Sequence, residues 1–439
     1  MKRFISIFIC LICVLSTICT VPASAVTFEC DVETFSDSIL MVNLDSDMVV
    51  FEKSADTKRY PASLTKIMSY IVVAEYFDDY DNTRIEVKRS IINSLQSKGI
   101  STSGLEGHVS KTLSVTDLLY AMMVPVGHDA ATVLADHISN ESGAKFVDMM
   151  NNKAKELGLK NTHFTNPTGV HDPEHYTTAR DMYTMTRYAM GLPMFSKICS
   201  TSSYYLEGDE YPLITTNYMV DQGRGGEYFY TYATGVKNGT TDQAGRCLVS
   251  TAVYNGYAYM IVCLHAPYNY ENDVTEQYCM IESANLYRWA FLNLDFVTQA
   301  TKSTPICEQK VANAWDTDSV LLVPQTDLNI ILPNDYKESD VTIVPDNTNV
   351  VSAPIEQGQV ITTATVYYKG QVVTTINLVS QDSVSVSFIM YISDLFKSIL
   401  TSVWFLLAVL IVVVLFVVFV TVSSSYNKKK KGNARRKYK

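Results

Sequence analysis

One apolar run near the carboxyl end constrains this chain more than any other feature. Residues 403–422 are apolar apart from Thr421, and four consecutive lysines follow at 428–431. A helix of this length rises about 30 Å, which matches the hydrocarbon core of a bilayer. Positive charge beside a span stays in the cytoplasm. The run therefore predicts a transmembrane helix over 403–422, with residues 423–439 as a basic cytoplasmic tail.

The amino end carries the pattern of a secretory signal peptide. A basic start is followed by an apolar run to about residue 14, and Ala-Ser-Ala at 23–25 matches a small-residue cleavage site. Residues 1–25 are therefore expected to be removed, with an uncleaved membrane anchor as the alternative. Both ends predict the same single-pass topology in the cell membrane, with residues 26 to about 400 extracellular.

The net charge is unevenly distributed. The whole chain carries −10, but residues 26–425 carry −20 once the eight basic residues of the tail and the two of the leader are set aside. An acidic extracellular body argues against nucleic acid as a partner. The basic tail instead fits the anionic lipid of the inner leaflet.

Six of the nine cysteines lie beyond the leader, which invites disulfides in an extracellular protein. The nearest pair, Cys247 and Cys263, flanks a hairpin turn at Asn255-Gly256. The register of a two-residue turn sets each cysteine opposite a leucine and points the two sulfur atoms to opposite faces of the sheet. We therefore expect no bridge between these two cysteines.

The order of the predicted elements indicates an α+β fold. The elements are expected as a hairpin over 37–54, helices over 61–77, 115–124, from 129, over 143–157 and 178–190, strands over 232–266 that include a hairpin at 245–266, and a helix over 274–293. Capping boxes at 114–117 and 178–181 are expected to begin two of these helices. Strands at both ends of a helical middle predict one antiparallel sheet covered by a helical cluster.

The composition changes after Pro305. From there to about residue 385, short strand-like runs alternate with Pro, Asn, Asp and Gly. This pattern predicts a small all-β domain over 305–385, following an α+β domain over 26–304. Residues 386–402 have an amphipathic pattern and are expected to link the β domain to the membrane span.

The stretch YPASLTKIM at 60–68 sets a serine one helical turn before a lysine. On a helix, Ser63 and Lys66 lie on one face, about 5–6 Å apart. The apolar helix leaves Lys66 poorly solvated, which lowers its pKa and makes a neutral amine available as a base. A serine within reach of such an amine is an activated nucleophile. The alternative is that Ser63 only lies at the start of an ordinary helix and that Lys66 extends its amine to solvent.

The same spacing occurs twice more, and its context differs there. Ser142 and Lys145 are expected to open a polar surface helix. Ser425 and Lys428 lie at the cytoplasmic edge of the membrane span. Neither setting would desolvate the lysine, so neither pair is expected to react.

Three other segments match known motifs together with the stretch around Ser63. They are GVKNGTTDQAG at 235–245, LLYAMMVPVGHDAA at 118–131 and NPTGVHDPEHYTTARDM at 166–182. With PASLTKIM, they resemble the motifs of the penicillin-binding proteins and serine β-lactamases, and most closely the low-molecular-mass D-alanyl-D-alanine carboxypeptidases. The resemblance covers roughly residues 30–385. It implies a β-lactamase-like domain followed by a small β domain.

The resemblance implies a role for each matching residue. Ser63 would be the acylated nucleophile, and Lys66 would be its general base. The substrate-binding residues would be Lys237, Asn238, Gly239 and Thr240. Among these, Lys237 would hold the terminal carboxylate of the substrate. The backbone N–H groups of Ser63 and Thr240 would form the oxyanion hole.

Two of the three motifs depart from the family pattern. The chain has Val-Gly-His at 126–128 where the family has Ser-x-Asn, and Lys-Asn-Gly at 237–239 where it has Lys-Thr-Gly. Val126 has no hydroxyl and cannot relay a proton, whereas His128 can donate or accept a hydrogen bond. His128 is therefore a third candidate catalytic residue. An ordinary imidazole, with a pKa near 6.5, would add a limb near neutrality to the pH profile.

The remaining candidates have simpler explanations. His171 and His175 have a metal-like spacing, but Pro173 lies between them in a loop-like stretch. No metal or cofactor is therefore expected. Asp129 and Asp242 are expected to be local caps.

The resemblance implies a membrane-anchored serine carboxypeptidase that removes the terminal D-alanine from peptidoglycan stem peptides. Its partners would be a stem peptide ending in D-Ala-D-Ala and β-lactam inhibitors. The altered motifs keep a second hypothesis open, in which a weakened or inactive relative binds peptidoglycan or acts as a scaffold. A β-lactamase or an esterase on the same fold is a third.

Overall fold

The computed structural model describes residues 28–436 except 270–274 and 348. The predicted signal peptide lies outside the described residues. The chain divides into two compact units. The first takes in the chain up to Thr298 together with Asn329–Thr342 and Tyr367–Thr374, and the second takes in the rest.

The first unit is built on a five-stranded antiparallel sheet with the order β2-β1-β9-β8-β7. Its strands are β1 (Ser38–Asn43), β2 (Val49–Lys53), β7 (Ala233–Thr241), β8 (Gly245–Tyr254) and β9 (Tyr257–Ala266). Both predicted hairpins are confirmed. They join through β1 and β9, although these strands are more than two hundred residues apart in the chain. This order leaves β7 at an edge of the sheet.

The turn between β8 and β9 follows the sequence prediction. Asn255 and Gly256 both have positive φ, at 49° and 85°, as a type I′ turn requires. Cys263 lies opposite Leu248, as expected. The β8–β9 ladder shifts between Arg246 and Leu248, where Cys247 faces the two β9 residues Leu264 and His265. Cys247 therefore lacks the single leucine partner that an unbroken register would provide. Both cysteines are free thiols.

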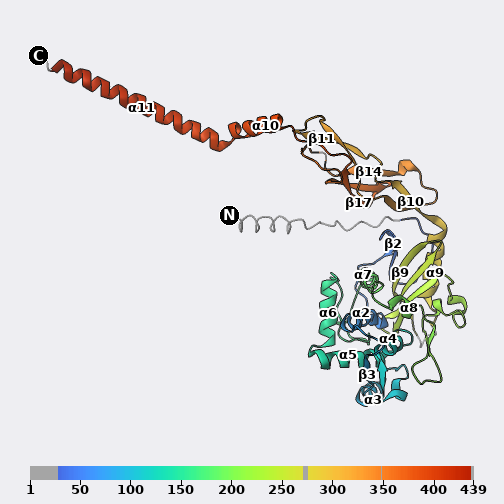
Figure 1. Cartoon of the computed structure of the whole chain (residues 1–439). Helices are drawn as coiled ribbons and strands as arrows, with labels where there is room; N and C mark the ends of the chain where they lie inside the picture. The colour runs from blue at the N-terminus through green and yellow to red at the C-terminus, as the bar shows by residue number, and fades with distance from the viewer. Residues whose placement is uncertain (1–27, 270–274, 348, 437–439) are drawn as a thin grey trace. The chain divides into compact units, whose positions relative to one another are not determined.

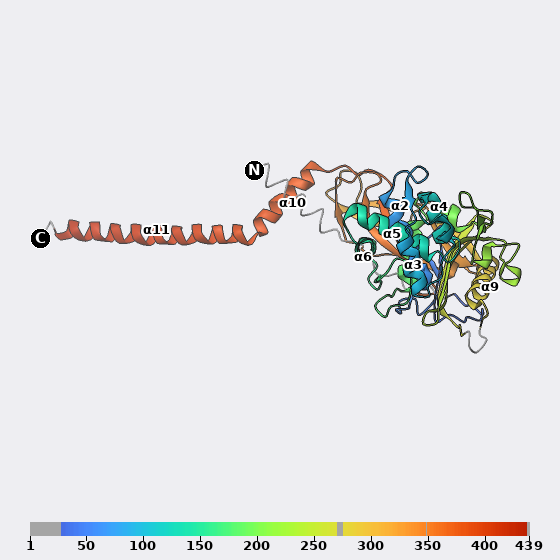
Figure 2. The ribbon, with the colours of Figure 1, turned by 90° about the horizontal axis from the view of Figure 1, so that it is seen from below.

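Helices cover both faces of this sheet (Figure 1). The helices are α2 (Lys66–Tyr76), α3 (Arg89–Ser97), α4 (Val115–Met123), α5 (His128–Ser142), α6 (Phe146–Glu156), α7 (Ala179–Ala189), α8 (Phe195–Cys199) and α9 (Tyr278–Asn293). Helix α9 packs against β8 and β9, and α7 packs against β1 and β9. Figure 2 shows α2 to α6 gathered together and α9 apart from them. The predicted antiparallel sheet with a helical cluster is confirmed.

Short elements complete this unit. They are the strand pairs β3 (Arg84–Glu86) with β4 (Thr112–Ser114) and β5 (Ser203–Tyr204) with β6 (Leu213–Ile214), and the 3₁₀ helices η1 (Ala62–Thr65), η2 (Leu105–His108), η3 (Tyr218–Val220) and η4 (Gly226–Tyr228).

Helix α2 lies at the centre of the helical cluster. Every residue from Lys66 to Ala74 is buried, as expected for a helix that is apolar on all sides. The predicted single helix from Pro61 is instead divided, because its first turn is the 3₁₀ helix η1 and α2 begins at Lys66. A hydrogen bond from the Leu64 nitrogen to the Pro61 carbonyl, 3.2 Å long, closes this tighter turn.

Both predicted capping boxes begin a helix. The Ser114 hydroxyl accepts a hydrogen bond from the Asp117 nitrogen at 3.0 Å, at the start of α4. The Thr178 hydroxyl accepts one from the Asp181 nitrogen at 3.1 Å, at the start of α7. Each side chain thus satisfies a backbone donor that has no partner inside the helix.

The prediction that Ser142 opens a helix is wrong. Ser142 is the last residue of α5, because Gly143 takes a left-handed conformation with a φ of 71° and ends the helix. Helix α6 begins later, at Phe146.

The predicted β-rich region forms a six-stranded sheet with the order β14-β16-β17-β12-β11-β15. Its strands are β11 (Cys307–Ala312), β12 (Ser319–Pro324), β14 (Val341–Pro345), β15 (Val351–Ser352), β16 (Val360–Tyr368) and β17 (Gln371–Ser380). A core that includes Leu322, Ala364 and Leu378, all fully buried, lies against this sheet. Two further strands, β10 (Leu294–Ala300) and β13 (Leu328–Pro333), pair with each other. The short helix η5 (Glu338–Asp340) precedes β14.

Two helices follow the β region, α10 (Phe388–Thr401) and α11 (Val403–Arg436). Within the described part of the chain, Val403–Ser424 is the one helical stretch long and apolar enough to cross a membrane, with a mean hydropathy of 3.5. The predicted apolar carboxyl-terminal helix is therefore confirmed.

Candidate active site

The candidate nucleophile lies where a short helix meets the edge of the sheet. Ser63 is part of η1, which packs against β7. A Cβ atom on Gly239 of β7 would lie 2.6 Å from the Ser63 nitrogen and 3.1 Å from the Ala62 Cβ. Only a glycine allows this approach, so the glycine of the third motif lets η1 rest on the strand. The fold thus brings the first and third motifs together.

Ser63 and Lys66 are hydrogen-bonded to each other. The Lys66 Nζ atom donates to Ser63 Oγ at 2.9 Å and to the Thr168 carbonyl at 2.8 Å. Side chains at i and i+3 eclipse in a 3₁₀ turn, which aligns the amine with the hydroxyl. The predicted contact is confirmed, and the Thr168 carbonyl is a partner that the motif alone does not reveal.

The surroundings of Lys66 favour its neutral form. The residue is fully buried. This burial, and then the charge of Lys237, hold the pKa of Lys66 well below its ordinary value, while Asp129 acts in the opposite direction. A buried ammonium loses its hydration, so the neutral amine is favoured. A neutral amine at hydrogen-bonding distance can accept the proton of Ser63.

The residue before the candidate nucleophile is strained. Ala62 has a φ of 48°, in the left-handed region. For a residue with a side chain this conformation costs about 1–3 kcal/mol and is often kept at functional sites. The Thr65 hydroxyl donates to the Ala62 carbonyl at 2.8 Å and supports this geometry.

Lys237 joins the third motif to the loop that carries the second. Its side chain is 2% exposed, and its Nζ atom donates to the Pro125 carbonyl at 3.2 Å. Burial lowers the pKa of Lys237 to about 8, and Cys199 acts weakly in the opposite direction. Lys237 thus lies beside the Val126 loop with a charge that depends on pH near neutrality.

Asn238, which replaces the usual threonine, has a specific partner. Its Oδ1 atom accepts a hydrogen bond from the Thr216 hydroxyl at 2.8 Å. The Thr216 nitrogen also donates to the Val124 carbonyl at the end of α4, at 3.3 Å. Thr216 therefore links the third motif to the loop of the second. It lies outside every motif, so sequence reasoning missed it.

His128 is next to the two lysines but is not a titrating group near neutrality. Its Nδ1 atom is buried and has no hydrogen-bond partner among the described residues. Burial, Lys66 and Lys237 together lower the pKa of His128 to about 3. His128 therefore does not have the ordinary pKa on which a limb near neutrality would depend, because desolvation and two neighbouring amines disfavour the imidazolium. Val126, which the resemblance places at the usual serine position, has no hydroxyl.

Asp129 anchors a neighbouring loop. It is fully buried, and its Oδ2 atom accepts hydrogen bonds from the backbone nitrogens of Ser103 and Leu105, at 2.9 and 3.2 Å. The expectation that Asp129 is a local cap is wrong, because these donors lie 26 and 24 positions away in the chain and α5 begins without a side-chain cap. Asp242 lies in the turn between β7 and β8.

His175 makes an internal hydrogen bond within the site. Its Nε2 atom lies 2.8 Å from the hydroxyl of Thr65, inside the first motif. Across the described residues, no three His, Cys, Asp or Glu side chains are grouped so as to hold a metal ion. The contact joins residues 110 positions apart, so sequence spacing offered no signal for it.

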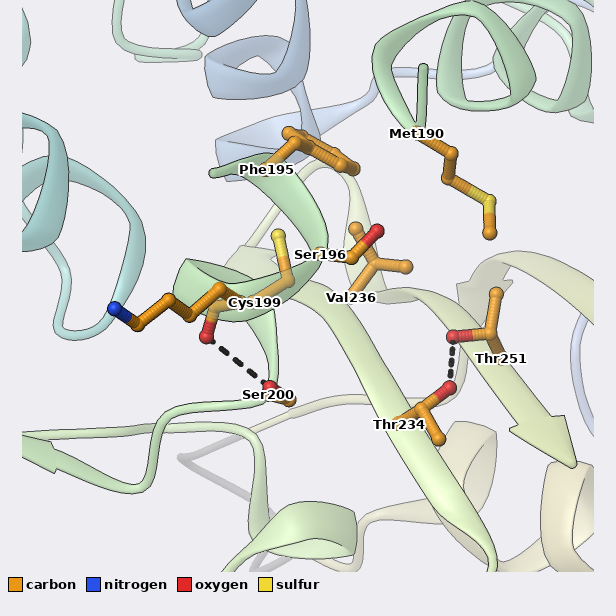
Figure 3. Close-up of a pocket in the computed structure, with 9 residues that line it drawn as sticks. Met190, Phe195, Ser196, Cys199, Ser200, Thr234, Val236 and Thr251 are labelled. Atoms are coloured by element: carbon orange, nitrogen blue, oxygen red, sulfur yellow. Dashed lines mark hydrogen bonds between the residues drawn. The ribbon is translucent and has the colours of Figure 1, made fainter. Parts of the chain in front are cut away.

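A cavity of about 300 Å³ lies beside β7 and α8 (Figure 3). It is lined by Met190, Phe195, Ser196, Lys197, Cys199, Ser200, Thr234, Val236 and Thr251. The hydroxyls of Thr234 and Thr251 are hydrogen-bonded to each other at 2.8 Å. Burial raises the pKa of the Cys199 thiol, so this thiol stays protonated and is a poor nucleophile. We therefore assign the role of nucleophile to Ser63 and not to Cys199 in this cavity.

A serine and a desolvated lysine in contact, at the edge of an antiparallel sheet with helices on both faces, is the arrangement of the penicillin-binding serine enzymes. The D-alanyl-D-alanine carboxypeptidase family profile, Peptidase_S11, matches residues 24–268. The profile of the C-terminal domain of penicillin-binding protein 5 matches residues 298–386. The chain belongs to the D-alanyl-D-alanine carboxypeptidase family.

Individual relatives agree with this assignment. The D-alanyl-D-alanine carboxypeptidase DacF of Bacillus subtilis is 26% identical over 338 residues, which cover 76% of this chain and 82% of DacF. DacA of Haemophilus influenzae is 29% identical over 350 residues, covering 78% of this chain and 84% of DacA. The crystal structure of penicillin-binding protein 5 from Haemophilus influenzae matches with a TM-score of 0.65 at 28% identity, covering 82% of this chain and 100% of the other.

Proposed function

We propose that this protein is a serine carboxypeptidase that releases the terminal D-alanine from stem peptides ending in D-Ala-D-Ala. The observation that carries the proposal is the 2.9 Å hydrogen bond from Lys66 to Ser63 at a fully buried lysine. In the first step, Ser63 Oγ attacks the carbonyl carbon of the penultimate D-alanine while its proton passes to Lys66 Nζ. The N–H groups of Ser63 and Thr240 stabilise the oxyanion that forms.

In the next step, the C–N bond to the terminal D-alanine breaks. Lys66 returns the proton to the leaving amine, because Val126 has no hydroxyl to relay it. Lys237 holds the terminal carboxylate in place during this exchange. Water then attacks the ester carbonyl and gives a proton to Lys66. The bond between the acyl carbon and Ser63 Oγ breaks, Lys66 returns the proton to Ser63, and the shortened peptide leaves with a terminal carboxyl group. The names of the relatives, which are D-alanyl-D-alanine carboxypeptidases, support this reaction.

The proposal is tested by D-alanine release from a diacetyl-Lys-D-Ala-D-Ala tripeptide. The purified full chain in detergent should release D-alanine, and a Ser63→Ala variant should not. A fluorescent penicillin should label the wild-type chain covalently and leave the variant unlabelled. Release at the same rate from both proteins would contradict the assignment of Ser63 as nucleophile. A wild-type chain that neither releases D-alanine nor takes up the label would contradict the enzyme itself.

The pH dependence should report Lys237. Its charged form binds the substrate carboxylate, so kcat/KM should fall as the pH rises through about 8, the pKa of Lys237 in this site. Lys66 acts in its neutral form, so protonating it at low pH should also reduce the rate. Measuring kcat/KM from pH 5 to 10 should show the basic limb. In Lys237→Arg the limb should disappear, because a guanidinium stays charged; a limb that persists there would contradict this role.

The altered second motif should limit the rate. Val126→Ser combined with His128→Asn restores the family residues and should raise turnover of the tripeptide roughly 30- to 900-fold, since one polar contact in the transition state contributes about 2–4 kcal/mol. His128→Ala alone should leave the pH profile above pH 5 unchanged, because the pKa of His128 is lowered to about 3. Unchanged turnover in the double variant would show that this loop is not limiting.

We propose further that the apolar helix anchors the protein in the cell membrane, with the body outside and the basic tail inside. The supporting observations are the apolar stretch Val403–Ser424 and the lysines at 428–431. Cleavage of the leader should leave Val26 as the first residue of the mature chain. Protease added to protoplasts should digest the body and spare a tail epitope. Digestion of the tail with protection of the body would contradict this orientation.

A further inference from the structure

A buried histidine from a distant segment is hydrogen-bonded to the first motif. His175 is 2% exposed, and its Nε2 atom lies 2.8 Å from the hydroxyl of Thr65. Thr65 lies between Ser63 and Lys66 in the chain and is fully buried. The ring of Phe164 packs edge-on against the imidazole at 5.5 Å. The steps proposed above leave His175 without a role.

The hydrogen bonds of His175 determine which nitrogen carries its proton. The backbone N–H of Thr165 donates to Nδ1 at 3.2 Å, and the Asn166 amide lies 3.3 Å from the same atom. A backbone N–H can only donate, so Nδ1 is the acceptor. Burial lowers the pKa of His175 to about 4, with Asp172 acting in the opposite direction. The ring is therefore neutral near pH 7, and its single N–H, on Nε2, donates to Thr65.

Thr65 connects His175 to Ala62, the residue before Ser63, through two hydrogen bonds. Its hydroxyl accepts from His175 and donates its own hydrogen to the Ala62 carbonyl at 2.8 Å. Gly169 lies against the same carbonyl, because a Cβ atom there would be 1.8 Å from the Ala62 oxygen. The Ala62 carbonyl thus accepts a hydrogen bond from Thr65 and packs against the backbone of Gly169. Ala62 itself has a left-handed φ of 48°.

The direction of the Ala62 carbonyl sets the direction of the Ser63 N–H. The two groups belong to one planar trans peptide and point in opposite directions. We infer that His175 is a positioning residue: through Thr65 and the Ala62 carbonyl, it aims the Ser63 N–H at the oxyanion of the acyl transition state. This inference rests on the proposed function. It assigns a role to a side chain that never touches the substrate.

Two pairs of variants test this chain of hydrogen bonds by D-alanine release from the tripeptide. Thr65→Val keeps the shape of the side chain but removes the hydroxyl, and Thr65→Ser keeps the hydroxyl. His175→Ala removes the donor. His108→Ala is the matched control, since His108 is also buried, at 3% exposure, and bonds Asp209 at 2.8 Å outside the site. Each variant is measured for kcat, KM and melting temperature.

An oxyanion contact forms only in the transition state, so its loss lowers kcat and leaves KM nearly unchanged. Thr65→Val and His175→Ala should lower kcat roughly 10²-fold, whereas Thr65→Ser should stay close to the wild type. His108→Ala should lower the melting temperature without lowering kcat. If His175→Ala does not fold, the two Thr65 variants still decide the question.

Two results would overturn the inference. One is a wild-type kcat in Thr65→Val, and the other is an equal loss in Thr65→Ser and Thr65→Val. Both leave the proposed function standing, because the wild-type chain still releases D-alanine. A wild-type chain that releases none contradicts the proposed function and the inference together, and it is recognised before any variant is compared.

Discussion

Replacing Lys66 with alanine is expected to remove nearly as much acylation as replacing Ser63, and the double variant is expected to lose little more. The two side chains form one hydrogen-bonded unit at 2.9 Å, and residues that act as a unit give strongly non-additive losses. Each single change should slow acylation roughly 10⁴-fold or more. The rate of fluorescent penicillin labelling and the release of D-alanine measure this loss.

Two further lysine variants separate base catalysis from charge and packing. Lys66→Arg should not restore acylation, because a guanidinium keeps its proton and cannot act as a base. Lys88→Ala removes a lysine paired with Asp136 at 2.6 Å outside the site, and it should leave acylation unchanged. Independent, additive losses at Ser63 and Lys66, or activity in Lys66→Arg, would show that Lys66 is structural.

A Gly239→Ala substitution should also cause a large loss, although it removes no chemical group. The added Cβ atom would lie 2.6 Å from the Ser63 nitrogen and 3.1 Å from the Ala62 Cβ. The first of these neighbours is backbone, so η1 has to move away from β7. A displacement of about 1 Å in a reacting group can cost 10²-fold in rate, and we expect at least this loss in penicillin labelling. Overpacking should also lower the free energy of unfolding by about 1–3 kcal/mol.

Gly107→Ala is the matched control for this substitution, because a Cβ atom there would meet nothing within 4 Å. It should change neither labelling nor stability. Labelling at the wild-type rate in Gly239→Ala would mean that the contact between η1 and β7 does not position Ser63.

The altered second motif lies beside two buried lysines, Lys66 and Lys237. In this motif, Val126 and a largely neutral His128 replace two polar family residues. Burial, and then the charge of Lys237, lowers the pKa of Lys66, which favours the neutral base. The same substitutions remove a hydroxyl that could return a proton to the leaving amine. These opposing effects are the reason for expecting retained but slow turnover.

Some features of the fold follow from neighbouring residues, and the sequence predicted these well. The Asn255-Gly256 turn, the caps at Ser114 and Thr178, and the apolar helix from Val403 are all confirmed. Each depends on the φ preference, hydrogen bonds or hydropathy of residues close together in the chain. Two differences from the prediction have local causes too: Gly143 ends α5 at Ser142, and an extra residue in β9 opposite Cys247 shifts the β8–β9 register.

The candidate site is a different case, because its residues acquire their properties from distant segments. The motif spacing placed Ser63 next to Lys66, and the resemblance added Lys237 and Gly239. The sequence alone therefore determined the family, the α+β fold with its β domain and apolar helix, and the pairing of one serine with one lysine. Spacing and composition suffice for the fold class and for the pair of Ser63 and Lys66, whereas the family follows from the resemblance of the motifs.

Only the tertiary structure decided how that pair is held and charged. The Thr168 carbonyl reaches Lys66 across 102 positions, and His175 reaches Thr65 across 110. The pKa of His128 falls to about 3 because folding buries the imidazole beside two lysines, which no spacing in the chain reveals. Desolvation and contacts between remote segments exist only once the chain is packed. For that reason the sequence predicted the pair of Ser63 and Lys66, whereas the packed structure added Thr168 and His175 and determined the protonation and direction of the groups.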